Sequence, residues 1–386
     1  MLEPQSPALF VLLIAMFGVL MWRTLVTRRT AFRVLAACLA FVPAMVFGVL
    51  AVNKYYGYYQ TWGAMAADLT QQGPSAASGV PDVELAADSR SGTLDGSRSH
   101  LKAAQRQGYL MRTTVTGRHS GITRVVYVYL PPQYFQPAYR AYRFPAIELI
   151  HGQPGVPQDW ITVVGVTHAF DRLLEHRLAQ PAVLVMPDAN GGDRISLQCL
   201  NQVGGPQDLT YLAMDLPAQI ARMLRVSRPG RAWAVAGYSE GGFCAANMAL
   251  RYPHQYGFAG VLSGYFTPLD NQLAGHPVSP FAGDARLQEQ NTPLDELPNL
   301  SAATVIPGFW LAAGAADGQD VASAERFWQE LRPRQPGAPL TLTPGSGHTM
   351  TTWRAQIPSM LTWMTPRLAR AAGPPAAGPP NRLLAR

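Results

Sequence analysis

The strongest constraint on the fold is a pentapeptide, Gly237-Tyr238-Ser239-Glu240-Gly241, which follows an apolar run and precedes a helical pattern. The run at 232–236 has the composition of a buried strand, and residues 242–252 have the spacing of a helix. A G-x-S-x-G sequence in this setting is typical of a sharp strand-to-helix turn that projects the serine hydroxyl above a sheet. The motif therefore predicts Ser239 as a nucleophile.

The rest of residues 107–368 has the same alternation of short apolar runs and longer helical patterns. Such alternation predicts an α/β fold with a mostly parallel central sheet and helices on both faces. We expect strands at 123–130, 145–150, 182–186, 232–236, 260–263, 309–313 and 339–343. We expect helices at 166–178, 209–224, 242–252, 321–331 and 351–368.

A serine nucleophile needs a base, and in this kind of fold the base is a histidine that follows the nucleophile in the chain. Three histidines follow Ser239. His254 lies at the end of a predicted helix and His276 in an irregular segment, whereas His348 lies on a Gly-rich loop after a late predicted strand. We therefore predict His348 as the base.

The base needs a carboxylate to orient it. Asp317 lies in a loop directly after the predicted strand 309–313 and is the expected acid. Asp320 is the alternative acid, but we expect it to cap the next helix, because Asp is favoured at helix N-caps.

An oxyanion hole requires two N–H donors. One is expected from Glu240, the residue after the nucleophile, and the other from Gln153, in the turn that follows the predicted strand 145–150. Trp160 and Tyr238 neighbour this region and are candidate substrate contacts, with core packing as the alternative for Trp160.

These motifs resemble the esterase branch of the α/β-hydrolase fold, which includes feruloyl esterases, esterase D-type enzymes and mycolyltransferases. The matching pieces are His151-Gly152-Gln153-Pro154-Gly155 with Trp160, residues 186–192 (MPDANGG), residues 237–242, residues 314–317, and Gly347-His348 with Trp353. The resemblance covers about residues 110–366 and implies the fold, the catalytic triad and the oxyanion donors by position. Glu240 departs from the pattern, because members of the family often have an apolar residue there.

Residues 1–54 contain two apolar runs, at 8–22 and 34–52, which predict two transmembrane helices. The linking segment holds only basic charges, Arg23, Arg28, Arg29 and Arg33, so the positive-inside rule places it in the cytoplasm and the rest of the chain outside. A cleaved signal peptide built from the second run is the alternative. We expect residues 55–106 to form an interfacial aromatic segment and a flexible linker, and residues 369–386 a disordered Pro/Gly/Ala-rich tail.

Charge and cysteine content narrow the functional classes. Of the formal net charge of +7, residues 1–54 and 367–386 contribute +4 each, which leaves −1 for the body and argues against nucleic acid as a partner. The sequence holds no HExxH or CxxC motif, so we expect no metal and no cofactor. Cys199 and Cys244 either form a disulfide or remain two buried thiols, since spacing alone cannot decide.

Together these features predict a membrane-anchored, extracytoplasmic serine esterase that acts on ester or lipid-like substrates through an acyl-serine intermediate. A first alternative is an acyltransferase, similar to mycolyltransferases, that passes the acyl group to a sugar or lipid alcohol. A second alternative is a non-catalytic envelope-binding module on a retained hydrolase fold.

Overall fold

The computed structural model of the 386-residue chain describes residues 2–69, 98–192, 196–273 and 276–374. The chain forms two compact units. Among the described residues, the first contains residues 2–69 together with Thr349–Thr351, and the second contains the others.

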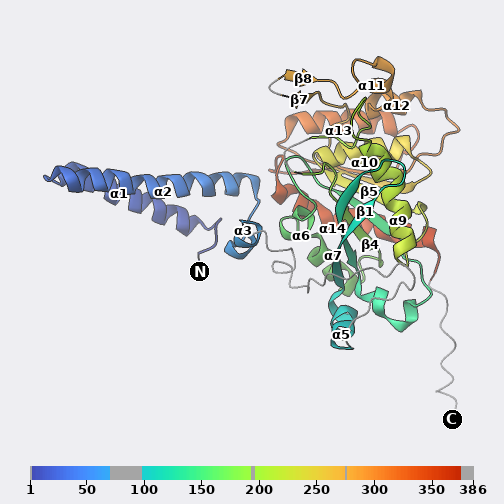
Figure 1. The fold of residues 1–386 in the computed structure, drawn as a ribbon, viewed down its shortest axis with the longest axis horizontal. Helices are drawn as coiled ribbons and strands as arrows, with labels where there is room; N and C mark the ends of the chain where they lie inside the picture. Colours follow the sequence, from blue (N-terminus) through green and yellow to red (C-terminus); the bar gives the residue numbers. More distant parts are fainter. Residues whose placement is uncertain (1, 70–97, 193–195, 274–275, 375–386) are drawn as a thin grey trace, which may run out of the picture. The chain divides into compact units, whose positions relative to one another are not determined.

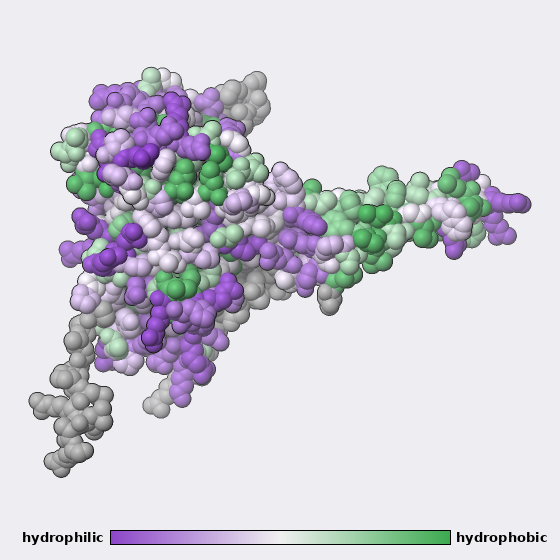
Figure 2. Space-filling model, turned by 180° about the vertical axis from the view of Figure 1, so that it is seen from behind, coloured by the Kyte–Doolittle hydropathy of each residue, from purple (hydrophilic) through white to green (hydrophobic). Residues whose placement is uncertain are grey.

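The N-terminal unit is a helical hairpin followed by a short helix, α3 (Trp62–Leu69). Helices α1 (Pro7–Val26) and α2 (Thr30–Tyr56) lie side by side, and hydrophobic residues gather along much of their surface (Figures 1 and 2). Small residues of α2, Ala36 and Ala40, are buried within the unit. Both helices are long and apolar enough to cross a membrane, although a signal sequence near an N-terminus has the same features.

The second unit is built on a mixed sheet of eight strands in the order β1-β2-β4-β3-β5-β6-β9-β10. β2 pairs antiparallel with β1 and β4, and every other neighbouring pair is parallel. The strands are β1 (Tyr109–Thr116), β2 (Thr123–Leu130), β3 (Ala146–Ile150), β4 (Val183–Pro187), β5 (Gly230–Tyr238), β6 (Tyr256–Leu262), β9 (Gly308–Gly314) and β10 (Leu340–Thr343). A separate two-stranded sheet consists of β7 (Asn271–Leu273) and β8 (His276–Val278).

Helices cover both faces of the large sheet (Figure 1). The described α-helices of this unit are α5 (Arg98–Gln107), α6 (Asp159–Thr162), α7 (Val166–Glu175), α8 (Asp208–Thr210), α9 (Leu216–Met223), α10 (Glu240–Arg251), α11 (Ala285–Gln290), α12 (Pro293–Asn299), α13 (Gly318–Leu331) and α14 (Met350–Ala372). A π-helical turn, Tyr211–Asp215, joins α8 to α9, and 3₁₀ turns occupy Pro132–Phe135 and Pro137–Tyr139.

Alternation along β6 shows how one strand serves two cores. Ala259 and Val261 are buried in the cluster that includes α9, α10 and α13. Gly260 points to the opposite face, where an added Cβ would lie 2.7 Å from Met360 Sδ in α14. Successive strand residues point to opposite faces, so a strand buried on both faces needs an almost continuous apolar sequence. That requirement explains why these strands could be recognised in the sequence.

The predicted α/β-hydrolase fold class is confirmed, and all seven expected strands form. Two differences concern the ends of the unit. β1 was not expected, because three consecutive buried residues at its start and exposed Arg112 after them hide the strand alternation. Helix α14 extends to Ala372, beyond the expected boundary at residue 368.

The expected linker at 55–106 is in part helical, because α3 lies within it and α5 begins at Arg98. Residues 70–97 of that linker, and residues 375–386 of the expected disordered tail, lie outside the described residues. The domain boundaries proposed from the sequence otherwise stay a proposal.

Candidate active site

Ser239 lies in the turn between β5 and α10, as the motif predicts. Its backbone has φ 56° and ψ −123°, a conformation that is costly for a residue with a side chain and that clusters at functional sites. The Ser239 N–H donates to Leu262 O of the neighbouring strand at 2.9 Å. The turn is very tight, since a Cβ on Gly241 would lie 2.1 Å from Ile150 O.

The His348 imidazole lies between Ser239 and two aspartates. Its Nε2 lies 2.9 Å from Ser239 Oγ, and its Nδ1 lies 2.9 Å from Asp317 Oδ2 and 2.6 Å from Asp320 Oδ2. Carboxylate oxygens only accept hydrogen bonds when ionised, so the ring proton belongs on Nδ1. Nε2 is then free to accept the proton of Ser239, which is the arrangement a general base needs.

Asp320 has a different place from the one expected of it. The residue at the N-cap position of α13 is Asp317, which makes no side-chain capping bond, and Asp320 follows in the first turn. The expected capping role of Asp320 is therefore wrong. The two aspartates are three positions apart in the sequence, and residues at this spacing at a helix start share a face, so both carboxylates reach one imidazole nitrogen.

Burial and charge act in opposite directions on this relay. Burial lowers the pKa of His348, but hydrogen bonds and charges from Asp320 and Asp317 outweigh it and leave that pKa raised. Burial, followed by the charge of Asp320, raises the pKa of Asp317. The negative charges of the two neighbouring carboxylates favour protonation of one of them, whereas a protonated His348 favours the ionised form of both carboxylates. The two carboxylates thus favour the cationic form of His348.

The loop after β3 packs directly against the nucleophile turn. A Cβ on Gly152 would lie 3.1 Å from Ser239 Cβ and 2.9 Å from the Tyr238 ring. His151 is fully buried, accepts from Ala189 N–H at Nε2 (3.0 Å) and lies 2.8 Å from Gly152 O at Nδ1. Its imidazole is therefore neutral with the proton on Nδ1, and it orders the loop that carries Gln153.

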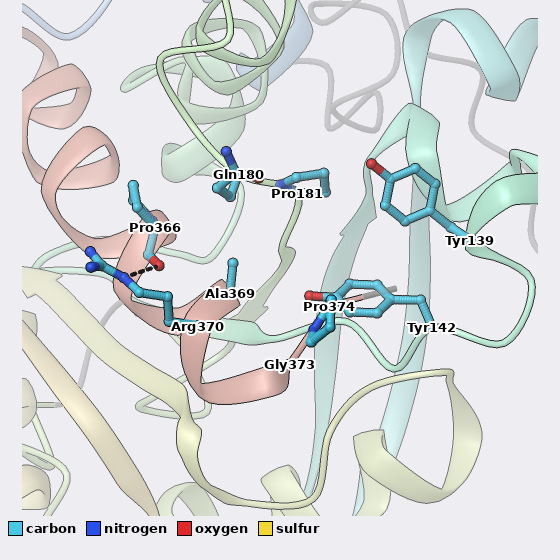
Figure 3. Close-up of a pocket in the computed structure, with 9 residues that line it drawn as sticks. All are labelled: Tyr139, Tyr142, Gln180, Pro181, Pro366, Ala369, Arg370, Gly373 and Pro374. Atoms are coloured by element: carbon cyan, nitrogen blue, oxygen red, sulfur yellow. Dashed lines mark hydrogen bonds between the residues drawn. The ribbon is translucent and has the colours of Figure 1, made fainter. Parts of the chain in front are cut away.

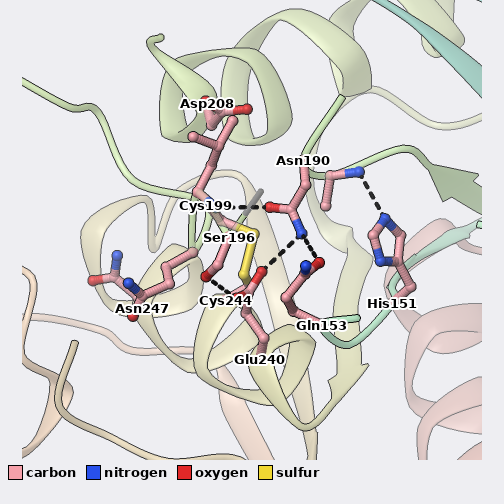
Figure 4. Close-up of a disulfide and its surroundings, with 12 residues drawn as sticks. His151, Gln153, Asn190, Ser196, Cys199, Asp208, Glu240, Cys244 and Asn247 are labelled. Carbon is pink, nitrogen blue, oxygen red and sulfur yellow. Dashed lines mark hydrogen bonds between the residues drawn. A yellow bond between two sulfur atoms is a disulfide. The ribbon is translucent and has the colours of Figure 1, made fainter. Parts of the chain in front are cut away.

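Glu240 is buried, and its carboxylate is bonded on both oxygens (Figure 4). Asn190 Nδ2 donates to Oε1 at 2.9 Å, and Ser196 Oγ donates to Oε2. Burial raises the pKa of Glu240, although these two hydrogen bonds act against the shift. The sequence prediction placed the Glu240 N–H in the oxyanion hole but missed Asn190 and Ser196. The sequence pointed to Asn190 only in so far as it lies in the motif at 186–192, and that motif did not indicate that Asn190 bonds Glu240.

The aromatic candidates form a chain behind the histidine. Trp160 and Tyr238 are 0% and 1% exposed, and their rings meet edge-to-face with centroids 4.9 Å apart. Tyr238 stacks on Trp353 at 4.5 Å, and Trp353 meets the His348 ring edge-to-face at 5.0 Å. Trp160 and Tyr238 thus pack, through Trp353, behind the His348 ring. A substrate contact for either residue stays a prediction.

The structure joins Cys199 and Cys244 in a disulfide with Cα atoms 5.5 Å apart, which settles the alternative that the sequence left open. Cys244 lies one turn into α10, so the bond ties the loop around Cys199 to the nucleophile helix (Figure 4).

Among the described residues, one group of carboxylate and imidazole atoms is close enough to hold a metal ion, Asp317, Asp320 and His348, with the atoms within 4.8 Å of one another. The same atoms hydrogen-bond to each other and to Ser239, so the relay accounts for their position.

A cavity of about 580 Å³ lies elsewhere, between the loop at Gln180 and the end of α14, and Tyr139, Tyr142 and Arg370 contribute to its wall (Figure 3). None of the predicted site residues lines it.

Comparison with known proteins identifies the family. A family model described as "Putative esterase" matches residues 120–364. The chain belongs to this esterase family. It is therefore a hydrolase, and the non-catalytic alternative is set aside. An uncharacterised protein of Corynebacterium glutamicum is 25% identical over 340 residues, 87% of this chain and 76% of that protein. The MPT51 antigen of Mycobacterium leprae is 35% identical over 72 residues, 19% of this chain and 23% of that protein.

Solved structures of similar fold include a ferulic acid esterase, with a TM-score of 0.59 and 20% identity over 68% of this chain and 99% of that one. An S-formylglutathione hydrolase from Agrobacterium tumefaciens has a TM-score of 0.54 and 15% identity over 68% and 97% of the two chains. FphF, a fluorophosphonate-binding serine hydrolase of Staphylococcus aureus, has a TM-score of 0.52 and 18% identity over 67% and 98%.

Proposed function

We propose that this esterase cleaves carboxylic esters through a covalent acyl-Ser239 intermediate. The observation that supports this most is the continuous relay from Ser239 Oγ to His348 Nε2 and from His348 Nδ1 to Asp317 and Asp320. No cofactor takes part in the proposed steps.

In the first half of the proposed reaction, Ser239 Oγ attacks the ester carbonyl while His348 Nε2 takes its proton. The N–H groups of Gln153 and Glu240 hold the oxyanion of the tetrahedral intermediate. The protonated His348 then returns the proton to the leaving alcohol, and the C–O bond breaks. In the second half, His348 deprotonates a water that attacks the acyl-enzyme, and Ser239 is regenerated.

The helix that follows Ser239 adds to the stabilisation of negative charge. The N-terminus of a helix carries a partial positive charge, and α10, 12 residues long, begins at Glu240. Because Ser239 immediately precedes this helix, the oxyanion of the proposed intermediate would form beside the helix N-terminus, where negative charge is favoured.

We further propose that α1 and α2 remain as two membrane spans, with the arginine-rich connection in the cytoplasm and the esterase unit outside. The Cys199–Cys244 disulfide supports this location, because disulfides persist in oxidising compartments and are rare in the cytosol. Mass measurement of the mature protein and protease protection in spheroplasts test this proposal. An N-terminus generated by cleavage after the second apolar run would favour a signal sequence instead.

The test of catalysis uses the full chain in detergent micelles, a panel of p-nitrophenyl esters of different acyl length, and a fluorophosphonate probe. We expect the probe to label wild type but not Ser239→Ala, and we expect kcat to fall in that variant by about 10⁴ or more. Ser227→Ala is the matched control, because it removes a serine hydroxyl that bonds Arg143 O and no residue of the relay, so labelling should be kept. Equal kcat in Ser239→Ala and wild type would remove Ser239 from the mechanism.

A further inference from the structure

The two expected oxyanion donors lie on segments that are distant in sequence. Gln153 belongs to the loop after β3, and Glu240 begins α10. An oxyanion hole is effective only when both N–H groups are held at the place where charge develops, and an error of 1 Å can cost about 10²-fold in rate. The side chains of the same two residues meet a common partner (Figure 4).

That partner is Asn190, which is 2% exposed. Its Nδ2 donates to Gln153 Oε1 at 3.1 Å and to Glu240 Oε1 at 2.9 Å, and its Oδ1 accepts from Leu197 N–H at 3.1 Å. An asparagine amide has two N–H donors and one oxygen, so both donors are directed at the two segments that carry the oxyanion donors. A side chain with this many buried bonds is fixed in position.

The backbone on either side of Asn190 is also held. Asn190 N–H donates to Asp188 Oδ1 at 3.1 Å, and the preceding Ala189 N–H donates to His151 Nε2 at 3.0 Å. His151 is the first residue of the loop that contains Gln153. Asn190 is therefore anchored to one of the two segments by its backbone neighbour and to both by its side chain.

Glu240 is the second half of this arrangement. Glu240 is 4% exposed, and its carboxylate accepts hydrogen bonds from Asn190 and Ser196. These two bonds compensate the cost of burying a charged group. Ser196 lies three residues before Cys199, whose disulfide with Cys244 attaches its loop to the first turns of α10. The carboxylate is thus held from both sides.

We propose that Asn190 and the Glu240 carboxylate form a hydrogen-bonded strap that sets the spacing between the Gln153 and Glu240 N–H groups. Both side chains are positioning residues for the oxyanion hole. This inference rests on the proposed acyl-serine mechanism, and it adds a reason for the carboxylate at position 240, where the resemblance led us to expect an apolar residue.

The test compares Asn190→Ala, Glu240→Ala and Glu240→Gln in the full chain, with p-nitrophenyl butyrate as substrate. A long-chain trifluoromethyl ketone, which forms a hemiketal oxyanion on the nucleophile, reports on the hole itself. Glutamine at 240 can still accept from Asn190, whereas alanine cannot. Asn247→Ala is the matched control, because Asn247 is a buried amide of α10 that bonds Asn291 and does not touch the strap.

We expect Asn190→Ala and Glu240→Ala to lower kcat by about 10- to 100-fold with KM changed less than about 3-fold, which is the signature of an interaction lost in the transition state. Affinity for the trifluoromethyl ketone should fall in parallel. Glu240→Gln should lose less than about 5-fold, and the double variant Asn190→Ala/Glu240→Ala should lose little more than either single variant, because both break one unit.

Misfolding is separated from loss of positioning by expressing kcat per Ser239 labelled at the end point of fluorophosphonate reaction. The proposal is overturned if kcat per labelled site stays at the wild-type value in Asn190→Ala, if Glu240→Gln loses as much as Glu240→Ala, or if Asn247→Ala loses as much as Asn190→Ala. Failure of the probe to label wild-type Ser239 would instead overturn the proposed function.

Discussion

A buried carboxyl group in the central sheet makes the stability of this protein depend on pH. Glu148 lies in β3 and is fully buried. Tyr256 donates to its Oε2 at 2.9 Å, while its Oε1 has no hydrogen-bond partner among the described residues. Burial raises the pKa of Glu148 from 4.5 to about 8, and the bond from Tyr256 only partly opposes this shift. The folded protein therefore holds a neutral Glu148 at pH 7.

The sign of the effect follows from proton binding. Between pH 4.5 and 8 the folded state keeps a proton on Glu148 that the unfolded state has released, so the free energy of unfolding falls as pH rises. Each pH unit in this window is equivalent to about 1.36 kcal/mol for one group. From pH 4.5 to 7 the interval is two and a half units, which gives a loss of about 3 kcal/mol from this residue alone.

Glu148→Gln removes the titration and keeps an acceptor for Tyr256. We expect the free energy of unfolding of the variant to rise relative to that of wild type as pH increases. The difference between the two proteins should grow by about 3 kcal/mol between pH 4.5 and 7. For a domain of this size that corresponds to a difference in Tm of roughly 5–10 °C. Calorimetry or fluorescence-detected melting of both proteins across pH 4.5–8 measures it.

The variant and wild type are compared at each pH, so the contributions of the other titrating groups, which are the same in both proteins, cancel in the difference. Glu330→Gln, which removes an exposed carboxylate from α13, is the control for a change of net charge. A difference between Glu148→Gln and wild type that stays constant from pH 4.5 to 8 would refute the reasoning.

Three further predictions concern the active site. Asp317→Asn and Asp320→Asn should each lower kcat/KM by about 3- to 30-fold, because one carboxylate still bonds His348 in each variant. The double variant should lose about 10³-fold or more in kcat/KM. Equal loss in the single and double variants would contradict a shared role of the two carboxylates. Since the two carboxylates raise the pKa of His348, Asp320→Asn should also shift the acid limb of the kcat/KM profile to lower pH, and an unshifted limb would count against this electrostatic role. Gly241→Ala should lose both activity and folding stability, because its Cβ would lie 2.1 Å from Ile150 O, a backbone atom that cannot move aside; wild-type melting and kcat in that variant would contradict the close packing of the turn.

The parts of the fold and the site that could be predicted from sequence are those set by local pattern and chain order. The strand, turn and helix around Ser239 follow from apolar composition and glycine within some twenty residues. His348 was predicted as the base because the order of the triad left few histidines to consider and only one lay on a loop after a strand, and the structure places its Nε2 2.9 Å from Ser239 Oγ.

Features that depend on where distant segments meet could not be read in the same way. The choice between Asp317 and Asp320 depends on where α13 begins, and a helix starting at Gly318 places both carboxylates at His348. The pairing of Cys199 with Cys244 depends on a Cα separation of 5.5 Å between residues 45 apart in sequence. Neither distance is encoded by residue type or spacing.

Glu240 shows how a residue that breaks a local rule is made acceptable by the rest of the molecule. A carboxylate beside an oxyanion hole is unfavourable when its charge faces the hole, and burial adds a further cost. Here the carboxylate is bonded by Asn190, 50 residues earlier in the chain, and by Ser196, 44 residues earlier. Because both partners come from the loop that follows β4, the same hydrogen bonds that neutralise the cost also link α10 to the segments packed against it. Replacing Glu240 by an apolar residue would remove the cost of burial together with the bonds from Asn190 and Ser196, whereas the bond from Asn190 to Gln153 would remain. If the proposed strap sets the spacing of the two N–H groups, such a replacement requires another contact between Asn190 and α10.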